Sequence, residues 1–256
     1  MVFVPSDAEY VGYVNYEQAY SVSHNASLFG TDALFELPQL GFQVVPSDIA
    51  YEVVIQLPEP RYSGSASMLE LVSGKQAELS NLLSSANVAK IHAYAGYRVF
   101  ELLTLKLGDK TSSLGFIAIV NGRVVFSNDQ NTGLQNVEAI LDQASSSRNG
   151  LFDQATVQRA VYASGVTDQD YVGLFVGMFP TQLNDTQMAV KSVVGKGDSL
   201  SVSRALLFPS SDVALQRLDQ AHEIYKNASS YRILDSWLVV TYSYPLSRMP
   251  AELLGI

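Results

Sequence analysis

One short segment limits the fold of this chain more than any other. From Gly115 to Ser127 the sequence reads GFIAIVNGRVVFS, so two apolar, β-branched runs flank Asn121-Gly122. β-Branched and aromatic residues favour strands, and Asn-Gly favours the positive φ angles that a two-residue hairpin turn requires. The segment therefore predicts an antiparallel β-hairpin.

Further strands and a helix are expected around this hairpin. IAYEVVIQLPEP, which begins at Ile49, ends in prolines, and SASMLELVSG, which begins at Ser65, is its expected hairpin partner. After the first hairpin, apolar residues recur at helical spacing from Leu134 to Leu141. Strand pairs with a few packed helices predict an α+β fold that is mainly antiparallel sheet.

The chain also repeats itself. The turn and strand VPSDAEYVGYV recurs as VPSDIAYEVVI, and LVSGKQAELSNLL followed by AGYRVFELLTLKL resembles LFPSSDVALQRLD followed by SSYRILDSWLVVTY. We interpret the pattern as a duplicated strand–strand–helix–strand unit within a single globular domain, residues 1–256. Its pseudo-repeat halves span about 44–144 and 166–256. The N-terminal strand is a candidate to cover a sheet edge that the second half leaves open.

Composition excludes several classes of partner and chemistry. Sixteen Lys and Arg residues against 25 Asp and Glu residues give a net charge of −9, which disfavours nucleic acid. No run is long and apolar enough to insert into a membrane. The absence of cysteine removes disulfides, thiolate nucleophiles and Cys-type metal sites. Only 16% of residues are charged, and neutral hydrogen-bonding residues replace them, as suits an exterior environment. The opening MVFVPSDAEY has no signal-peptide pattern, so an extracytoplasmic protein would carry its signal or anchor upstream.

The polar loop after the hairpin, Asn128 to Gly133, has some features of a calcium loop. Counting from Asp129, however, the sixth position is Leu134 and the twelfth is Ile140, where an EF-hand needs Gly and a carboxylate. Asn131 or Thr132 stands where a helix N-cap belongs. We therefore interpret the loop as a connector.

Few residues offer catalytic or metal-binding chemistry. The three histidines, His24, His92 and His222, lie in no metal-ligand spacing. His92 is interpreted as a structural histidine on a strand, and His222 as a surface residue beside Asp219 on a helix. GKGD, which begins at Gly195, reads as a hairpin turn because the phosphate-loop pattern is absent. The sequence predicts no catalytic, cofactor-binding or metal-binding residues and no cofactor.

Carboxylates and tyrosines leave two alternatives open. Asp168 with Asp170, or Asp7 with Glu9, offer paired carboxylates of the kind that hydrolases use, although such pairs are common near turns. Tyrosines occur on strands and at strand ends, where they serve packing or, when exposed, a protein or glycan contact. The tyrosines concerned are Tyr10, Tyr13, Tyr16, Tyr20, Tyr94, Tyr97, Tyr162, Tyr171, Tyr231, Tyr242 and Tyr244.

VPSDAEYVGYVNY together with LGFIAIVNGRVVFSNDQNTGLQNVEAIL resembles a broad group of secreted or lipid-anchored prokaryotic surface proteins of unknown function. The resemblance covers about a third of the chain and implies an extracytoplasmic location, with no catalytic residues to transfer.

The favoured hypothesis is a non-enzymatic binding or structural domain that contacts another surface protein or itself. The alternatives are a carrier of a small apolar ligand between sheet and helices, and a carboxylate-dependent hydrolase.

Overall fold

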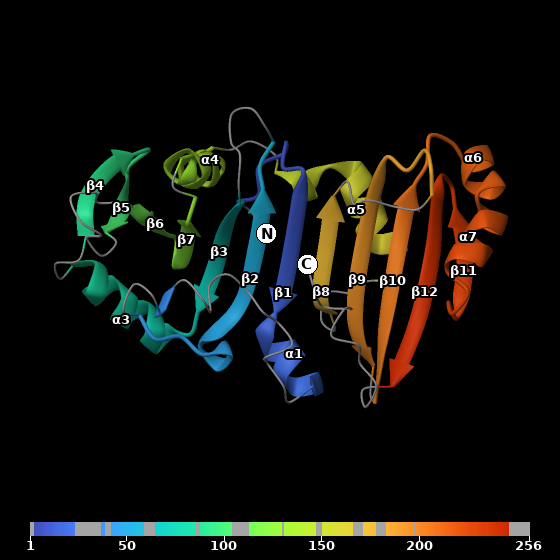
Figure 1. Cartoon of the computed structure of the whole chain (residues 1–256), viewed down its shortest axis with the longest axis horizontal. Helices are drawn as coiled ribbons and strands as arrows, with labels where there is room; N and C mark the ends of the chain where they lie inside the picture. The colour runs from blue at the N-terminus through green and yellow to red at the C-terminus, as the bar shows by residue number, and fades with distance from the viewer. Residues whose placement is uncertain are drawn as a thin grey trace, which may run out of the picture. The chain divides into compact units, whose positions relative to one another are not determined.

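The computed structural model describes residues 3–23, 37–38, 42–58, 65–84, 88–103, 113–129, 131–146, 150–165, 171–177, 183–196 and 198–245. These residues form an α+β fold of antiparallel sheet with packed helices, as the sequence predicts (Figure 1). The chain divides into two compact units. The first comprises Met1–Glu9 and Gly30–Phe152, and the second comprises Tyr10–Phe29 and Asp153–Ile256.

The first unit contains an antiparallel sheet in the order β2-β3-β7-β6-β5-β4. Its strands are β2 (Ile49–Gln56), β3 (Ser65–Leu71), β4 (Val88–Tyr94), β5 (Tyr97–Leu103), β6 (Ser113–Val120) and β7 (Arg123–Ser127). Three hairpins supply them, and β2 pairs with β3 as the sequence predicts. β3 then pairs with β7, and β5 with β6, which joins the hairpins into one sheet.

The hairpin predicted around Asn121-Gly122 is confirmed. Val120 pairs with Arg123, so the turn has two residues, and both have positive φ, 47° at Asn121 and 81° at Gly122. These angles suit the right-handed twist of the flanking strands.

Among the described residues of the first unit, two helices of full length pack on the sheet. They are α3 (Ser73–Ser84) and α4 (Gly133–Ser145), and a 3₁₀ turn, η2 (Pro46–Asp48), precedes β2. α4 contacts β6 and β7 and buries Val137, Ile140 and Leu141, which confirms the helix predicted from their spacing. A second 3₁₀ turn, η3 (Leu151–Asp153), follows α4 in the chain.

The second unit contains a sheet in the order β11-β12-β10-β9-β8-β1. Its strands are β1 (Tyr10–Asn15), β8 (Tyr171–Gly177), β9 (Met188–Lys196), β10 (Ser199–Leu207), β11 (Ser230–Leu234) and β12 (Trp237–Pro245). The N-terminal strand β1 pairs antiparallel with β8, from Tyr10 opposite Gly177 to Val14 opposite Gly173. The edge that the N-terminal segment covers is therefore the edge of β8.

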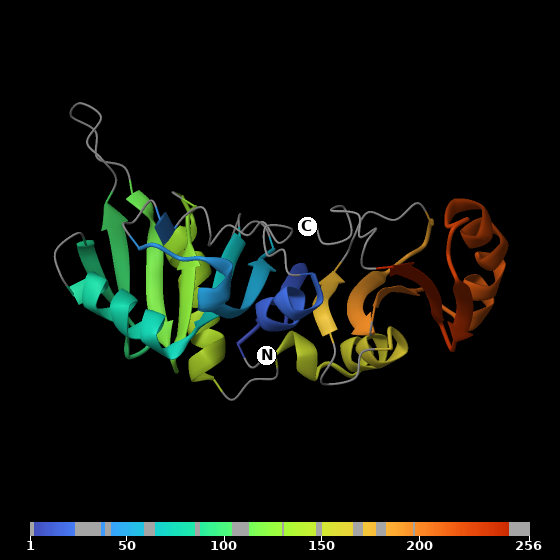
Figure 2. The same ribbon diagram turned by 90° about the horizontal axis from the view of Figure 1, so that it is seen from below.

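The described helices of the second unit are α1 (Tyr16–Ser23), α5 (Ala155–Ala163), α6 (Ser211–Gln216) and α7 (Leu218–Ile224). α5 lies behind the sheet in Figure 1 and below it in Figure 2, whereas α6 and α7 lie at the β11 end. Ala214 of α6 and Ala221 of α7 are buried in one apolar cluster with Leu206, Leu238 and Val240 of the sheet. α5 and the α6–α7 pair thus cover opposite faces of the sheet.

Each unit contains a hairpin, then helical residues, then a second hairpin. In the first unit these are β2–β3, α3 and β4–β5, and in the second β9–β10, α6 with α7, and β11–β12. In each unit two strands thus follow these helical residues, whereas the predicted repeat unit has one strand after its helix. The predicted duplication, its boundaries and the single-domain description stay predictions.

Glycine at position 115 is required by a close approach of the backbone. Gly115 has φ +148°, and a Cβ atom there would lie 2.5 Å from the Ser127 carbonyl oxygen. We expect Gly115→Ala to lower the free energy of unfolding by about 2–4 kcal/mol. Gly74→Ala is the control, because a Cβ at this α3 position meets nothing within 4 Å and alanine favours helix by about 1 kcal/mol. Urea unfolding of both variants checks this; equal stability of the two would contradict it.

Candidate binding site

Antiparallel pairing in the second unit separates its side chains into two different faces. One row across the sheet consists of Phe175, Lys191, Arg204, Val240 and Tyr231, which are directly opposite one another on successive strands. Residues in such a row point to the same face, and their neighbours in the chain point to the other. The sheet therefore carries two basic residues near its middle, on one face.

The other face is covered by α5. Ser192, which follows Lys191, donates a hydrogen bond through its hydroxyl to the carbonyl oxygen of Ser164 at the end of α5, at 3.0 Å. On the same face, the hydroxyls of Ser203 and Thr241 lie 3.1 Å apart. Lys191 and Arg204 consequently point away from α5.

Lys191 is a largely buried cation. Its Nζ lies 5.1 Å from the centre of the Phe175 ring, a cation–π contact. Burial, and secondarily the charge of Arg204, lowers the pKa of Lys191 from 10.5 to about 8. Directly opposite residues on antiparallel strands hold their Cβ atoms about 5 Å apart, and like charges there repel. The fold thus holds two like charges together.

Arg204 is exposed and lies beside tyrosines. Its guanidinium carbon is 6.0 Å from the centre of the Tyr225 ring, and Tyr225 is a buried residue directly after α7. Burial raises the pKa of Tyr225, while the charge of Arg204 and a hydrogen bond from it act in the opposite direction. Arg204 therefore contacts an aromatic hydroxyl.

Two further tyrosines extend this face along β12. The rings of Tyr242 and Tyr244 stack, with centres 6.0 Å apart and planes 16° apart. Burial raises the pKa of Tyr242 to about 12, and Arg204 opposes this shift. The hydroxyl of Tyr242 is therefore protonated at neutral pH and available as a hydrogen-bond donor.

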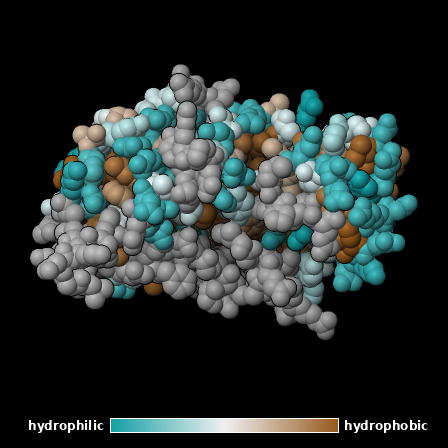
Figure 3. Space-filling view, turned by 45° about the horizontal axis from the view of Figure 1, so that its top comes forward, coloured by the Kyte–Doolittle hydropathy of each residue, from teal (hydrophilic) through white to brown (hydrophobic). Residues whose placement is uncertain are grey.

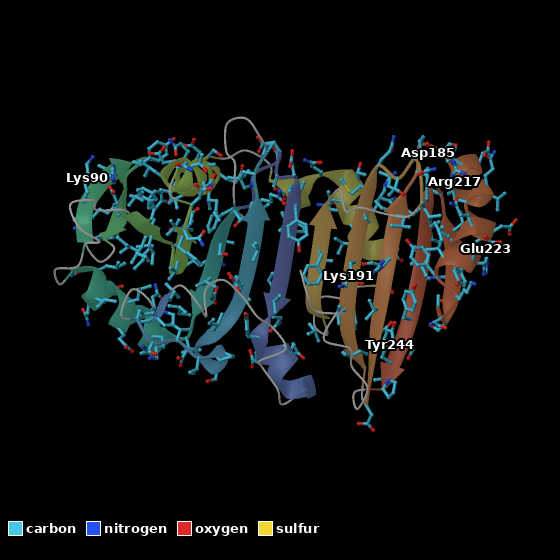
Figure 4. The ribbon with its side chains drawn as sticks, viewed as in Figure 1. Lys90, Asp185, Lys191, Arg217, Glu223 and Tyr244 are labelled. Carbon is cyan, nitrogen blue, oxygen red and sulfur yellow. The ribbon has the colours of Figure 1, made fainter. Side chains whose placement is uncertain are left out.

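We call Lys191, Arg204, Tyr225, Tyr242 and Tyr244 the Lys191–Arg204 face. Figure 4 marks Lys191 within the sheet and Tyr244 toward the end of β12. The face combines two positive charges with amphipathic rings, which is the composition of a surface that contacts a protein or an anionic group. On the side of the molecule in Figure 3, described hydrophobic residues occur in small groups between hydrophilic ones.

Sequence reasoning missed the Lys191–Arg204 pair, although the signal for it was present. The segment GKGD is confirmed as a hairpin turn, because Lys196 pairs with Ser199 and only two residues separate them. Counting back five residues from Lys196 and forward five residues from Ser199 gives Lys191 and Arg204, which are therefore opposite each other. The two-residue turn alone would have predicted the cation pair.

The first unit contains a second polar cluster, around His92 of β4. The His92 Nε2 atom lies 2.9 Å from Glu101 Oε2 on β5, and the His92 ring meets Phe116 edge-on at 6.1 Å. Tyr94 donates a hydrogen bond to Asp142 of α4 at 3.0 Å. His92 thus has the carboxylate partner and ring contact of a structural histidine.

The connector loop is organised by Asp129. Its carboxylate accepts hydrogen bonds from the backbone N–H groups of Asn131 and Thr132, at 2.8 and 2.9 Å, and those bonds hold the pKa of Asp129 below its ordinary value, Thr132 first. Thr132 occupies the N-cap position of α4, but its side chain makes no capping hydrogen bond. Asp129 satisfies donors before the helix instead.

The other candidates do not converge within the described residues. Asp7 and Glu9 are exposed, and the His222 ring lies against Tyr231 with centres 3.8 Å apart. His24, Asp168 and Asp170 lie outside the residues that the structure describes. Among the described residues, no three His, Asp or Glu side chains are grouped to hold a metal ion.

The described helices are all too short or too polar to cross a bilayer.

Comparison with known proteins identifies the fold alone. Neither the family models nor the curated proteins contain a match to this chain. Three solved structures of TP0453 are similar: crystal form I with TM-score 0.54 and 9% identity, form III with 0.52 and 9%, and form IV with 0.53 and 8%. Each of the three matches covers 98% of this chain. The matched part is 94% of the chain in crystal form I and 95% of the chain in forms III and IV.

Lys191 predicts a specific pH dependence of stability. The unfolded chain holds this proton up to a pH near 10.5 and the folded chain releases it near 8, so between these values the free energy of unfolding rises with pH. Below pH 8 the folded state carries the full penalty of the charge. We expect Lys191→Met to stabilise the protein at neutral pH by on the order of 1–3 kcal/mol, and by much less above pH 10.5.

Chemical unfolding of wild type and Lys191→Met across this pH range measures the effect. Lys226→Met is the control, because Lys226 is exposed. An unchanged or lower stability of Lys191→Met at neutral pH would contradict the prediction.

Glu138 of α4 predicts the opposite pH dependence. Burial, and then the charge of Asp142, raises the pKa of Glu138, while His92 opposes the shift. A raised carboxyl pKa stabilises the folded state at low pH, and this contribution is lost as pH rises through the folded-state value. We expect Glu138→Gln to raise the midpoint of thermal unfolding at neutral pH by about 1–2 °C, and not at about pH 3. Glu223→Gln, at an exposed position, should show no such difference.

Proposed function

We propose that this protein is a non-enzymatic, extracytoplasmic binding or structural domain, and that its Lys191–Arg204 face contacts a partner protein. The partner is another surface protein or a second copy of this chain. The observation that carries the proposal is the grouping of Tyr242, Tyr244 and the exposed Arg204 on a face opposite to α5.

The composition of this face supports a protein contact. Tyrosine and arginine are enriched in protein interfaces, since a ring and a guanidinium each bury apolar area while keeping hydrogen-bond donors. Tyr242 and Tyr244 are partly exposed, and their stacked rings are already ordered, so binding would cost little side-chain entropy. The face therefore has the properties of an interface formed in advance.

Two sequence properties support the extracytoplasmic location. The chain has few charged residues and many neutral hydrogen-bonding residues, so its surface keeps its character when the surroundings acidify. It also resembles secreted and lipid-anchored surface proteins in two segments. The alternatives, a carrier of a small apolar ligand and a hydrolase that uses Asp168 and Asp170, stay predictions.

The absence of cysteine provides a direct test of location and face together. Tyr244→Cys places a single thiol on the Lys191–Arg204 face, and Tyr162→Cys places one on α5, where Tyr162 is 83% exposed. A membrane-impermeant maleimide that carries a benzophenone is added to intact cells of the source organism, and then the cells are irradiated. The benzophenone also restores an aromatic group at position 244.

We expect both thiols to be labelled on intact cells, and a discrete crosslinked product to form from position 244 but not from position 162. Labelling of either thiol only after lysis would refute the extracytoplasmic location. Labelling without a crosslinked product from position 244, or with the same product from both positions, would refute the role of this face.

A further inference from the structure

The Lys191–Arg204 face has a charge that the described part of the chain does not balance. Ion pairs among the described residues involve Lys75, His92, Arg123 and Arg217. Lys191 and Arg204 are instead placed over the rings of Phe175 and Tyr225. Among the described residues, Lys191 and Arg204 are adjacent cations that each lie on a ring rather than beside a carboxylate, in a chain with 25 acidic and 16 basic residues.

The arrangement is costly without a counter-charge. Lys191 is largely removed from water, and Arg204 is its direct neighbour across the strands. Both burial and like charge oppose the protonated lysine. A negative group placed between the two side chains would offset both effects, because it attracts each cation and replaces lost water as a hydrogen-bond acceptor.

The surrounding donors favour a carboxylate. The planar guanidinium of Arg204 presents paired N–H groups that match the two oxygens of a carboxylate, and Lys191 adds an ammonium donor. Tyr242, whose hydroxyl stays protonated, lies within the electrostatic influence of Arg204. The stacked rings of Tyr242 and Tyr244 continue beyond the cations along β12, so the face extends further than a free ion needs.

We infer that Lys191 and Arg204, with Tyr242 beside them, bind the carboxylate of an acidic segment of a partner protein. This inference rests on the proposed function, since it specifies the chemistry of the partner at the same face. Charge complementarity selects this occupant. The two cations offer hydrogen-bond donors and no acceptors, and the aromatic surface beside them can pack on the peptide chain around an Asp or Glu.

The test measures binding of a short blocked Glu-rich peptide to the purified whole chain by titration calorimetry at low salt. The matched peptide has Gln in place of each Glu. We expect Arg204→Gln to weaken binding of the Glu-rich peptide by at least about tenfold, since it removes a charge-assisted paired hydrogen bond. Lys191→Met should weaken binding by about fivefold or more, and Lys226→Met should leave it unchanged.

Loss of folding does not explain this pattern, because Lys191→Met is expected to be more stable than wild type. A second measurement follows Lys191 directly, by NMR titration of its side chain with and without the Glu-rich peptide. A bound carboxylate should move the titration of Lys191 to higher pH, which a contact elsewhere would not do.

Equal binding of the Glu-rich and Gln-rich peptides, or equal binding by wild type and Arg204→Gln, would overturn the inference. Inorganic phosphate alone is a further arm, and displacement of the peptide by phosphate at equal concentration would also overturn it, in favour of a free-oxyanion site. If a crosslinked product forms from position 244 but the Glu-rich peptide does not bind, the binding face stands and only its acidic partner fails. If the Glu-rich peptide binds but no crosslinked product forms from position 244, the carboxylate site stands and the proposed contact with a partner protein in cells is refuted.

Discussion

Antiparallel pairing around two-residue turns is the constraint on which the rest of this structure depends. Each turn fixes which residues lie opposite one another, and the alternation of side chains then assigns every residue to one face of the sheet. In the second unit the turn between Lys196 and Ser199 decides that Lys191 lies opposite Arg204 and that Ser192 lies opposite Ser203. A shift of β10 by one residue would turn Arg204 to the face that α5 covers and away from Lys191.

The two faces of this sheet use their polar groups differently. On the α5 side, Ser192 makes a hydrogen bond to the backbone of Ser164, which satisfies a buried hydroxyl and attaches the helix. On the other side, Arg204 remains exposed and Lys191 lies against Phe175. Local rules of sequence and packing explain the first face, whereas the second departs from them, and such departures are expected where a protein contacts something else.

Much of the fold could be predicted because its determinants are local. Asn121-Gly122 predicts its own hairpin, and the apolar spacing from Leu134 to Leu141 predicts α4, since both signals lie within a few neighbouring residues. The candidate site was harder, because Tyr225 approaches Arg204 only through the packing of α7 on the sheet. The predicted repeat aligns the Tyr-Arg pair of β5 with the Tyr-Arg pair of β11. In the structure these pairs lie on opposite sides of their hairpin turns, because Tyr97 follows the β4–β5 turn and Tyr231 precedes the β11–β12 turn.

The pairing of β1 with β8 has a consequence for how the second unit reaches its folded state. Most strands pair with the next strand in the chain, and such short loops close quickly. Tyr10 must instead find Gly177, with Gly30–Phe152 of the first unit in between, and closing so long a loop carries a larger entropic cost. During synthesis β1 emerges long before its partner, so the edge of β8 is completed late and depends on a strand made first.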